Sequence, residues 1–393
     1  MKNAPTILQV IPWLDSGGVE RGTVDIAKAI IDAGGKALVA SERGRLSADL
    51  EEMGGVQLEF EGRTKNPFKI LHSHAKQIEK MIKEQGVDLV HARSRAPAWS
   101  AYLAARRAGV PFVTTYHGAY SQKGRFKAFY NSVMAKGDVV IANSGYTRDL
   151  VAGRNPDAKD RLTVIYRGVD LEKFDPAVIS GEQKQALRSK WGLDERPVLL
   201  LPSRLTRWKG QAFILPVLGV LKERGLSFQV ALIGDDQGRQ SYVEELDALI
   251  KTHGLQDMVK RVGHCADMPA AYALADVTIV PSQDAETFGR SAAESLAMQT
   301  PVLVGDLGAQ PEVVAAPEGF EGDSWLGQSL THGDEKAWQD AVVKSLTSKA
   351  DKTSEQAIKA RDHVAKTFSL QSMGQQTMAV YDQLIGSTLV AKE

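Results

Sequence analysis

The chain of 393 residues contains little cysteine and no long apolar run, and both absences narrow what it can be. Its one cysteine, Cys265, excludes an internal disulfide and a zinc site built from cysteines. No stretch of about 18 or more apolar residues occurs, so the sequence predicts no membrane-spanning helix. The first residues lead straight into an apolar run without the apolar core of a signal peptide, and we expect a cytoplasmic protein in a reducing compartment.

The formal net charge of the chain is zero, because its 48 Lys and Arg residues balance its 48 Asp and Glu residues. Nothing in the overall charge indicates a nucleic-acid partner. The charges are unevenly spread, however: between Gly62 and Arg148 the chain carries 15 Lys and Arg against 4 Asp and Glu. This basic stretch is either a set of solvated helix faces or a surface that meets an anionic lipid or acceptor.

Three cofactor motifs are absent as well. No two glycines stand two positions apart, which removes the G-x-G-x-x-G fingerprint of dinucleotide enzymes. Gly17 and Gly22 have the spacing of a phosphate-binding P-loop, but no lysine follows Gly22. There is no D-x-D, and therefore no aspartate pair to hold a divalent ion on a diphosphate. We expect no metal ion and no other cofactor.

The chain does contain short apolar runs that alternate with longer amphipathic stretches, and this pattern occurs twice. Such runs predict parallel sheets covered by helices on both faces. We predict an α/β protein of two doubly wound Rossmann-like domains, residues 1–175 and 176–370, with a last helix over 371–388 that packs back on the first domain. The predicted strands include Ile7–Ile11, Ala37–Ala40, Leu89–His91, Phe112–Thr115, Val139–Ala142, Val198–Leu201, Gln229–Ile233, Val277–Val280 and Val302–Val304.

Ligands of doubly wound sheets bind beyond the carboxyl ends of the strands, and an interdomain cleft is the default site. The basic segment Arg204–Gly210 follows a predicted strand of the second domain. Its arginines can bridge phosphate oxygens as a fork, and Lys209 adds a point charge. The segment is therefore either a phosphate site or an ordinary basic loop.

Glu286 and Glu294 bracket the start of a predicted helix over residues 291–298. The N-terminus of a helix has unpaired N–H groups and is suited to bind an anionic ligand. A carboxylate just before the helix cannot attract that anion, so it is better suited to accept hydrogen bonds from hydroxyl groups. On spacing alone, a capping glutamate and a solvated helix glutamate are the favoured interpretation. A polyhydroxylated ligand that carries a phosphate is the alternative.

Further candidates follow strands of the first domain. His117 and Gly118 end one strand, and His117 either faces a ligand or is a structural histidine. Arg93 and Arg95 follow another strand and should lie on the same rim. Gly17-Gly18, between the first strand and the first helix, either lets the backbone approach a ligand closely or makes a tight turn.

Together these motifs resemble the retaining glycosyltransferases of family 4, which have the GT-B fold of two Rossmann-like domains that face each other across a cleft. Residues 91–100 and 114–118 are similar to lipopolysaccharide-core glycosyltransferases of Gram-negative bacteria. Ser203 and Thr287 stand where the family usually has glycine, which puts the donor in doubt. The resemblance also rests on Ala142-Asn143-Ser144, Gly168-Val169-Asp170, Phe174-Asp175-Pro176, Pro281-Ser282 and Pro311-Glu312-Val313-Val314.

The resemblance implies transfer of a hexose from a nucleotide-sugar, with GDP-mannose favoured, to a lipopolysaccharide-core or other glycolipid or polysaccharide acceptor. It implies a front-face, metal-independent mechanism. A nucleotide-sugar 2-epimerase and a non-catalytic nucleotide-sugar-binding protein of the same fold are the alternatives. The expected partners are the donor and the acceptor, with no nucleic acid. The chain would associate peripherally with the cytoplasmic face of the inner membrane, where Tyr120, Phe126, Phe129 and Tyr130 either touch lipid or belong to the core.

The resemblance also assigns roles to residues. Arg204 and Lys209 would grip the diphosphate, Glu286 the sugar hydroxyls and Glu294 the ribose. The implied catalytic residues are Arg204, Lys209, His117 and Glu286. The implied donor-binding residues are Gly17, Gly18, Thr287, Phe288, Gly289, Arg290, Glu294, Gly263, His264 and Cys265. The implied acceptor-side residues are Arg93, Arg95 and Tyr120.

Overall fold

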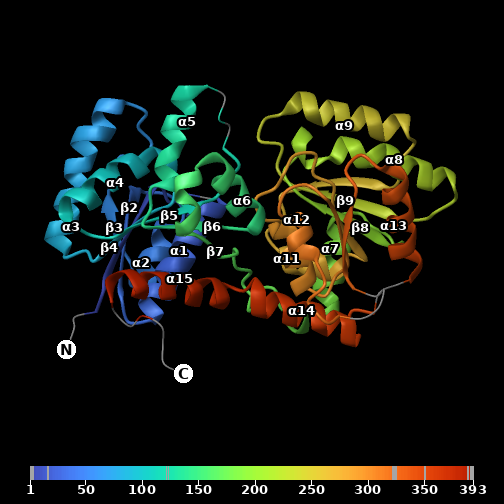
Figure 1. The fold of residues 1–393 in the computed structure, drawn as a ribbon. Helices are drawn as coiled ribbons and strands as arrows, with labels where there is room; N and C mark the ends of the chain where they lie inside the picture. Colours follow the sequence, from blue (N-terminus) through green and yellow to red (C-terminus); the bar gives the residue numbers. More distant parts are fainter. Residues whose placement is uncertain are drawn as a thin grey trace. The chain divides into compact units, whose positions relative to one another are not determined.

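The computed structural model describes residues 4–15, 17–120, 122, 124–320, 325–348, 351–386 and 389. The chain divides into two compact units (Figure 1). The N-terminal unit consists of Met1–Gly168 together with Leu370–Glu393, and the C-terminal unit is Val169–Ser369. The division after Gly168 precedes the boundary expected at residue 175. Residues 387 and 388 of the expected last helix lie outside the described residues.

The N-terminal unit is built on a parallel sheet with the strand order β3-β2-β1-β4-β5-β6-β7. Side chains alternate between its faces, so Leu8 and Val10 enter one core cluster and Ile7 and Ile11 enter another. The strands are β1 (Thr6–Trp13), β2 (Lys36–Glu42), β3 (Val56–Glu59), β4 (Leu89–Ala92), β5 (Phe112–Tyr116), β6 (Val139–Ala142) and β7 (Leu162–Val164).

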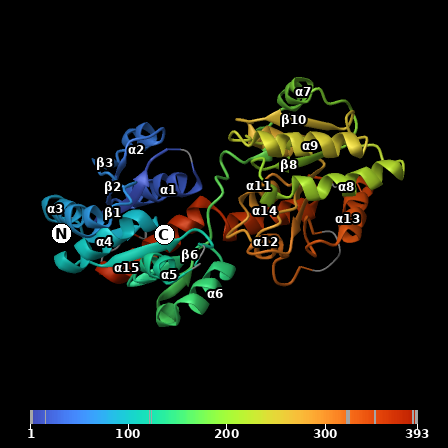
Figure 2. The ribbon, with the colours of Figure 1, turned by 90° about the horizontal axis from the view of Figure 1, so that it is seen from above.

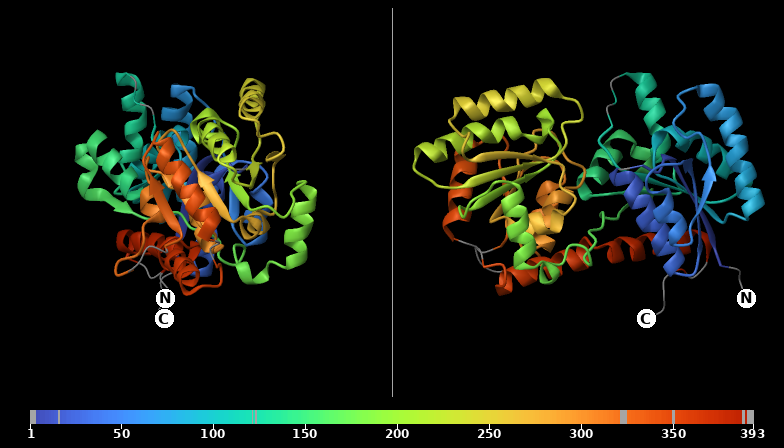
Figure 3. Two further views of the ribbon diagram at one scale, coloured as in Figure 1. Left: turned by 90° about the vertical axis from the view of Figure 1, so that its right-hand side faces the viewer. Right: turned by 180° about the vertical axis from the view of Figure 1, so that it is seen from behind.

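Helices cover both faces of this sheet. Apolar side chains of α3 and α4 fill one core cluster, and those of α1 and α15 fill the other. The last helix, α15, packs on α1 and is the red helix beside the blue ones in Figures 1 and 3. The helices are α1 (Gly18–Asp32), α2 (Ser47–Glu52), α3 (Ala75–Gln85), α4 (Arg95–Ala108), α5 (Arg125–Ser132), α6 (Gly145–Arg154) and α15 (Leu370–Ile385).

The C-terminal unit has a second parallel sheet with the order β10-β9-β8-β11-β12-β13. Its central strands are fully buried, as expected for a sheet that is covered on both faces. The strands are β8 (Val198–Pro202), β9 (Gln229–Ile233), β10 (Val259–Gly263), β11 (Val277–Val280), β12 (Val302–Gly305) and β13 (Gly327–Leu330).

Helices α8, α9 and α13 supply the core on one face of this sheet (Figure 2). Helices α10, α11 and α12 contact its strands elsewhere. The predicted helix over 291–298 corresponds to α11, shifted by one residue. The helices are α7 (Gly181–Lys190), α8 (Gln211–Glu223), α9 (Gln240–Thr252), α10 (Met268–Leu274), α11 (Arg290–Ala297), α12 (Gln310–Val314), α13 (Glu335–Ser348) and α14 (Glu355–Thr367).

The strand orders give each sheet one place where the direction of winding reverses. In the N-terminal unit this point lies between β1 and β4, and in the C-terminal unit between β8 and β11. Ligands of doubly wound folds bind at such a point, beyond the carboxyl ends of the strands. No helix among the described residues is long and apolar enough to cross a membrane, and the same part of the chain holds no group of three or more side chains that could together bind a metal ion.

Candidate functional site

The loop after β8 is fastened to the loop after β11. Lys209 ends a short 3-10 helix, and Gly210 follows it with φ of +77°. A Cβ on Gly210 would lie 1.8 Å from the carbonyl oxygen of Pro281, so only glycine fits this position. The backbone N–H of Gln283 donates to the carbonyl of Trp208 at 2.7 Å. The two loops therefore meet at the switch point of the C-terminal sheet.

The structure brings Lys209 and Glu286 together at this point. Lys209 Nζ lies 2.8 Å from Glu286 Oε1, and each side chain is only 13% exposed. Gln310 Nε2 donates to the same oxygen at 2.8 Å, and so does the hydroxyl of Ser282. Within the described chain, Glu286 Oε2 makes no hydrogen bond and is not enclosed. Three donors thus fix one oxygen of the carboxylate and leave the other open.

Glu294, on α11, repeats this arrangement. The buried hydroxyl of Tyr272 donates to Glu294 Oε2 at 3.0 Å, and Oε1 makes no hydrogen bond to the residues described. Burial raises the pKa of Glu294 above its usual value, while Arg290 and the Tyr272 hydroxyl act in the opposite direction. Each glutamate therefore has one oxygen that protein donors hold and one oxygen that stays open to a ligand.

Tyr272 is itself held in place by Lys352. The Nζ atom of Lys352 donates to the carbonyls of Tyr272, Ala273 and Ala275 and to the hydroxyl of Thr300, at 2.6–3.0 Å. These carbonyls belong to the C-terminal end of α10, which attracts a cation. Burial lowers the pKa of Lys352 to about 7.

The start of α11 also requires glycine. Gly289 precedes the helix with φ of +121°, a conformation that side chains rarely adopt. Phe288 is buried and packs edge-to-face on Phe368. Arg290 is the first helical residue, and Thr287 lies beside Phe288 in the loop. The predicted donor-binding segment 287–290 is thus a rigid entry into the helix.

The remaining predicted donor residues of the C-terminal unit lie along the same edge of its sheet. Arg204 is exposed and its guanidinium donates to Gln237 Oε1 at 3.4 Å. Gly263 ends β10, and its carbonyl accepts from Gly234, which packs closely on Ser203. His264 is exposed, and burial raises the pKa of the neighbouring Cys265 thiol.

In the N-terminal unit, His117 follows β5 and its Nδ1 atom lies 3.1 Å from an Arg167 nitrogen. Burial, Arg167, Arg93 and His91 lower the pKa of His117 well below its usual value, so the ring is neutral at pH 7. His91 is a buried structural histidine between Tyr381 and Thr115, at 2.6 and 2.7 Å.

The predicted acceptor-side residues separate into two places. The Arg95 guanidinium lies over the Tyr120 ring at 4.0 Å and donates to Asn131. Burial raises the pKa of Tyr120 to about 12. Arg93 is only 4% exposed; it donates to Gln9 at 3.4 Å and forms no ion pair with any described residue. Arg93 therefore does not share a surface with Arg95.

Gly17 and Gly18 mark the start of α1. Gly17 is the N-cap in an extended conformation, and a Cβ there would lie 2.1 Å from a carboxylate oxygen of Glu20. A side chain at Gly17 would therefore displace Glu20. Gly18 is the first residue of the helix.

Sequence reasoning missed three residues that donate to the two glutamates, Tyr272, Ser282 and Gln310, and also Lys352, which holds Tyr272. Ser282 stands in the Pro281-Ser282 pair that the sequence did single out, but nothing indicated its contact with Glu286. Tyr272 and Gln310 lie 22 and 24 residues from their glutamate partners, and no local spacing signals such contacts.

Two parallel, doubly wound sheets of this strand order define a GT-B fold. Family models agree with this architecture: residues 16–173 match "Glycosyltransferase Family 4" and residues 183–362 match "Glycosyl transferases group 1". A glycosyltransferase from Rickettsia africae ESF-5, of known crystal structure, is 32% identical, with a TM-score of 0.88 over 98% of this chain and 99% of that one. The chain belongs to the glycosyltransferases of family 4.

The descriptions of two other similar proteins mention a nucleotide-sugar. A GDP-mannose-dependent alpha-(1-6)-phosphatidylinositol monomannoside mannosyltransferase of Mycolicibacterium smegmatis is 29% identical over 253 residues, which are 61% of this chain and 64% of the relative. An Anabaena protein solved in complex with UDP-glucose is 24% identical, with a TM-score of 0.79 over 96% of this chain and 100% of that one. At this identity the Anabaena structure shows the shared fold alone.

Proposed function

We propose that this glycosyltransferase moves a hexose from a nucleotide-sugar to a glycan or glycolipid acceptor with retention of anomeric configuration. The observation that carries the proposal is the Lys209–Glu286 pair at the switch point of the C-terminal sheet. It combines a cation for the leaving diphosphate with a carboxylate oxygen that is free to accept from a sugar hydroxyl.

The resting contacts support a division of labour between these two groups. Without donor, Lys209 and Glu286 balance each other's charge in a site that is largely shielded from water. An entering diphosphate gives Lys209 and Arg204 a new anionic partner. Glu286 keeps its bonds from Ser282 and Gln310, and its open oxygen receives the sugar. Glu294 would receive the ribose hydroxyls through its open oxygen in the same way.

Departure of the sugar builds negative charge on the diphosphate, and Arg204 and Lys209 would stabilise that charge in the transition state. Glu286 is held by three donors and serves as a hydrogen-bond acceptor rather than as a nucleophile. We therefore favour front-face displacement, in which the leaving phosphate takes the proton of the acceptor hydroxyl. The two cations would carry the task that a divalent ion performs elsewhere, so activity should survive a chelator.

The donor is proposed to be GDP-mannose, as in the Mycolicibacterium relative, whose name specifies this donor. The Anabaena neighbour binds UDP-glucose, so UDP-sugars form the second arm of the test.

The acceptor is proposed to be lipid-linked, in a lipopolysaccharide core or a related glycolipid. Support comes from α5 of the N-terminal unit, where Phe126 is 94% and Phe129 is 65% exposed. Arg125 and Lys127 stand on the same short helix. Exposed aromatic rings among cations suit the surface of an anionic membrane.

The test is incubation of the purified protein with GDP-mannose, UDP-glucose and other nucleotide-sugars, with and without a glycolipid extract. Nucleotide release that depends on acceptor, and a product with the anomeric configuration of the donor by NMR, supports the proposal. Conversion of donor alone would indicate an epimerase, and binding without turnover a non-catalytic protein. Trapping of a glycosylated enzyme would exclude front-face displacement.

A further inference from the structure

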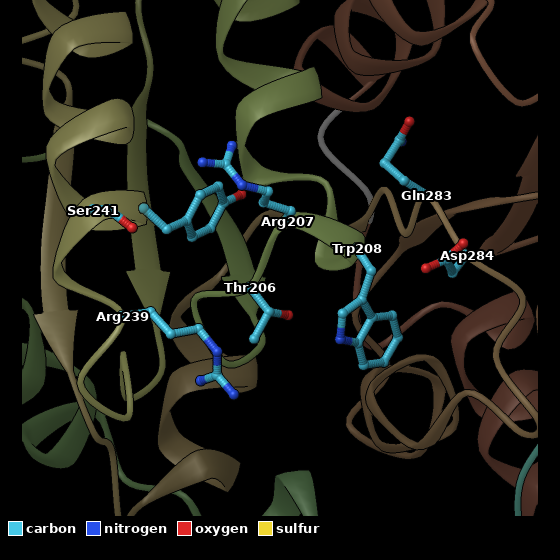
Figure 4. Close-up of a pocket in the computed structure, with 8 residues that line it drawn as sticks. Thr206, Arg207, Trp208, Arg239, Ser241, Gln283 and Asp284 are labelled. Carbon is cyan, nitrogen blue, oxygen red and sulfur yellow. The ribbon is translucent and has the colours of Figure 1, made fainter. Parts of the chain in front are cut away.

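Beside the Lys209 loop, the C-terminal unit holds an open cavity of about 600 Å³ (Figure 4). Cavities of this size accommodate small ligands such as one or two sugar rings. The residues that line it come from the loop after β8, the start of α9 and the loop after β11. They are Thr206, Arg207, Trp208, Arg239, Ser241, Tyr242, Gln283 and Asp284.

Trp208 separates this cavity from the proposed donor site. The Lys209 ammonium lies 4.3 Å from the centre of the indole ring, and the Trp208 carbonyl accepts from Gln283 N–H. In Figure 4, Trp208 and Asp284 stand on one side of the cavity, Arg207 and Arg239 on the other. The indole is therefore a fixed aromatic wall next to the lysine that would hold the donor phosphates.

The polar groups of the cavity are only partly used by the protein. Thr206 is 5% exposed, and its hydroxyl has no hydrogen-bond partner among the residues that the structure describes. Arg239 bonds the Asp236 carbonyl and Gln237 Oε1, which leaves most of its five N–H donors. Asp284 is exposed and takes part in no ion pair with a described residue. A ligand would thus find both donors and acceptors.

The balance of charge indicates what kind of ligand fits. Arg207 is paired with Glu245 and lies over the Tyr242 ring. The remaining charged groups, Arg239 and Asp284, have opposite sign. A phosphate or carboxylate site concentrates cations without a nearby carboxylate, whereas a sugar hydroxyl both donates and accepts. An aromatic wall that faces Arg239 across the cavity and stands on the same side as Asp284 suits the apolar face of a pyranose ring.

We propose that this cavity is a carbohydrate subsite that takes a neutral pyranose of the acceptor glycan. The inference rests on the proposed function, because it assigns the cavity to the acceptor of the same reaction. Trp208 would stack on the ring, and Arg239 and Asp284 would bond its hydroxyls.

Saturation-transfer NMR tests the proposal with methyl α-D-mannopyranoside and methyl α-D-glucopyranoside as probes. The intact protein should transfer saturation to at least one of them at millimolar concentration. Arg239→Ala and Asp284→Ala should each weaken this binding about fivefold or more, the effect of losing hydrogen bonds to a charged group. Arg224→Ala, which changes an exposed arginine at the end of α8, is the matched control and should leave it unchanged. All three variants should bind GDP or UDP like the parent.

A parent protein that binds GDP or UDP but neither pyranoside would overturn the subsite, as would pyranoside signals that both cavity variants retain. Binding of mannose 6-phosphate without binding of the neutral sugars would show an anion site instead. Failure of the parent to bind any nucleoside diphosphate or to release nucleotide from any donor would count against the proposed function. In that case, a pyranoside signal of the parent that both cavity variants lose would still support the subsite.

Discussion

The β1–β4 position of the N-terminal sheet and the β8–β11 position of the C-terminal sheet are topologically equivalent, but the charged side chains that follow their strands differ in pairing and burial. After β8 and β11, Lys209 and Glu286 pair with each other and leave one carboxylate oxygen open. After β4, Arg93 is enclosed without an ion pair among the described residues, near two neutral histidines. One topology thus supports both an ion pair that leaves one carboxylate oxygen open and a buried cation that has no ion pair among the described residues and only the more distant attraction of Asp25.

The comparison has an energetic meaning. A buried unpaired charge is costly, whereas a close pair offsets much of its own desolvation. The C-terminal site should therefore matter for turnover, and the N-terminal cation should carry a cost in stability. Four substitutions test this contrast.

Lys209→Ala should have the largest effect. It removes charge from the developing diphosphate anion, and we expect kcat to fall by about 10²–10³-fold, the cost of removing one preorganised group. The rate of acceptor-dependent nucleotide release measures kcat, and Arg224→Ala is a control that should retain the parent rate. An unchanged rate would end the role proposed for the Lys209–Glu286 pair.

Lys352→Met tests a second cation, which is partly buried and surrounded by four oxygens. Since the pKa of Lys352 is lowered from 10.5 to about 7, the unfolded chain binds more protons at this site between these values. Stability should therefore rise with pH from about 7 towards 10.5, by roughly 1 kcal/mol per pH unit from this group. The free energy of unfolding of this variant, measured in urea, should lack this dependence on pH. Lys359→Met, which changes an exposed lysine, should keep it. A slope that persists in Lys352→Met would show that another group titrates.

Tyr272→Phe should have a smaller effect on activity, and this effect should be confined to donor binding. The lost hydrogen bond frees Glu294, and we expect the donor KM to rise about 5- to 10-fold with kcat nearly unchanged. Because the Tyr272 hydroxyl lowers the pKa of Glu294 against the effect of burial, the variant should lose donor binding at a higher pH than the parent on acidification. A fall in kcat at constant KM would contradict a positioning role.

Arg93→Met should have the smallest effect on folding. Replacing a buried unpaired guanidinium by an apolar side chain of similar length should leave the free energy of unfolding unchanged or raise it by about 1 kcal/mol. Urea unfolding measures it. A loss of more than about 2 kcal/mol would mean that Arg93 is compensated, and the contrast between the two switch points would disappear.

The sequence predicted the centres of both sheets better than their edges. All nine predicted strands are present, whereas β3, β7, β10 and β13 were not among them. These four strands are the outermost strands of the two sheets, and each is partly exposed. An edge strand needs no continuous apolar run, so the pattern that reveals a buried parallel strand is missing there.

The site was predictable where it lies within short motifs and not where it depends on tertiary contacts. The loop with Arg204 and Lys209 and the segment from Glu286 to Glu294 could be recognised from residue order. The contact of Tyr272 with Glu294 and that of Gln310 with Glu286 could not, because each joins separate helices and loops. The burial of Arg93 was also missed, since a charged residue after a strand was expected on the rim.

The three donors on Glu286 Oε1 have a consequence for sugar stereochemistry. Ser282 and Gln310, together with Lys209 in the absence of donor, fix the plane of the carboxylate, so both lone pairs of Oε2 are directed within that plane. A hydroxyl on the opposite side of the same ring carbon would lie out of that plane. Discrimination between epimeric hexoses can therefore be encoded in Ser282 and Gln310, which never need to touch the sugar.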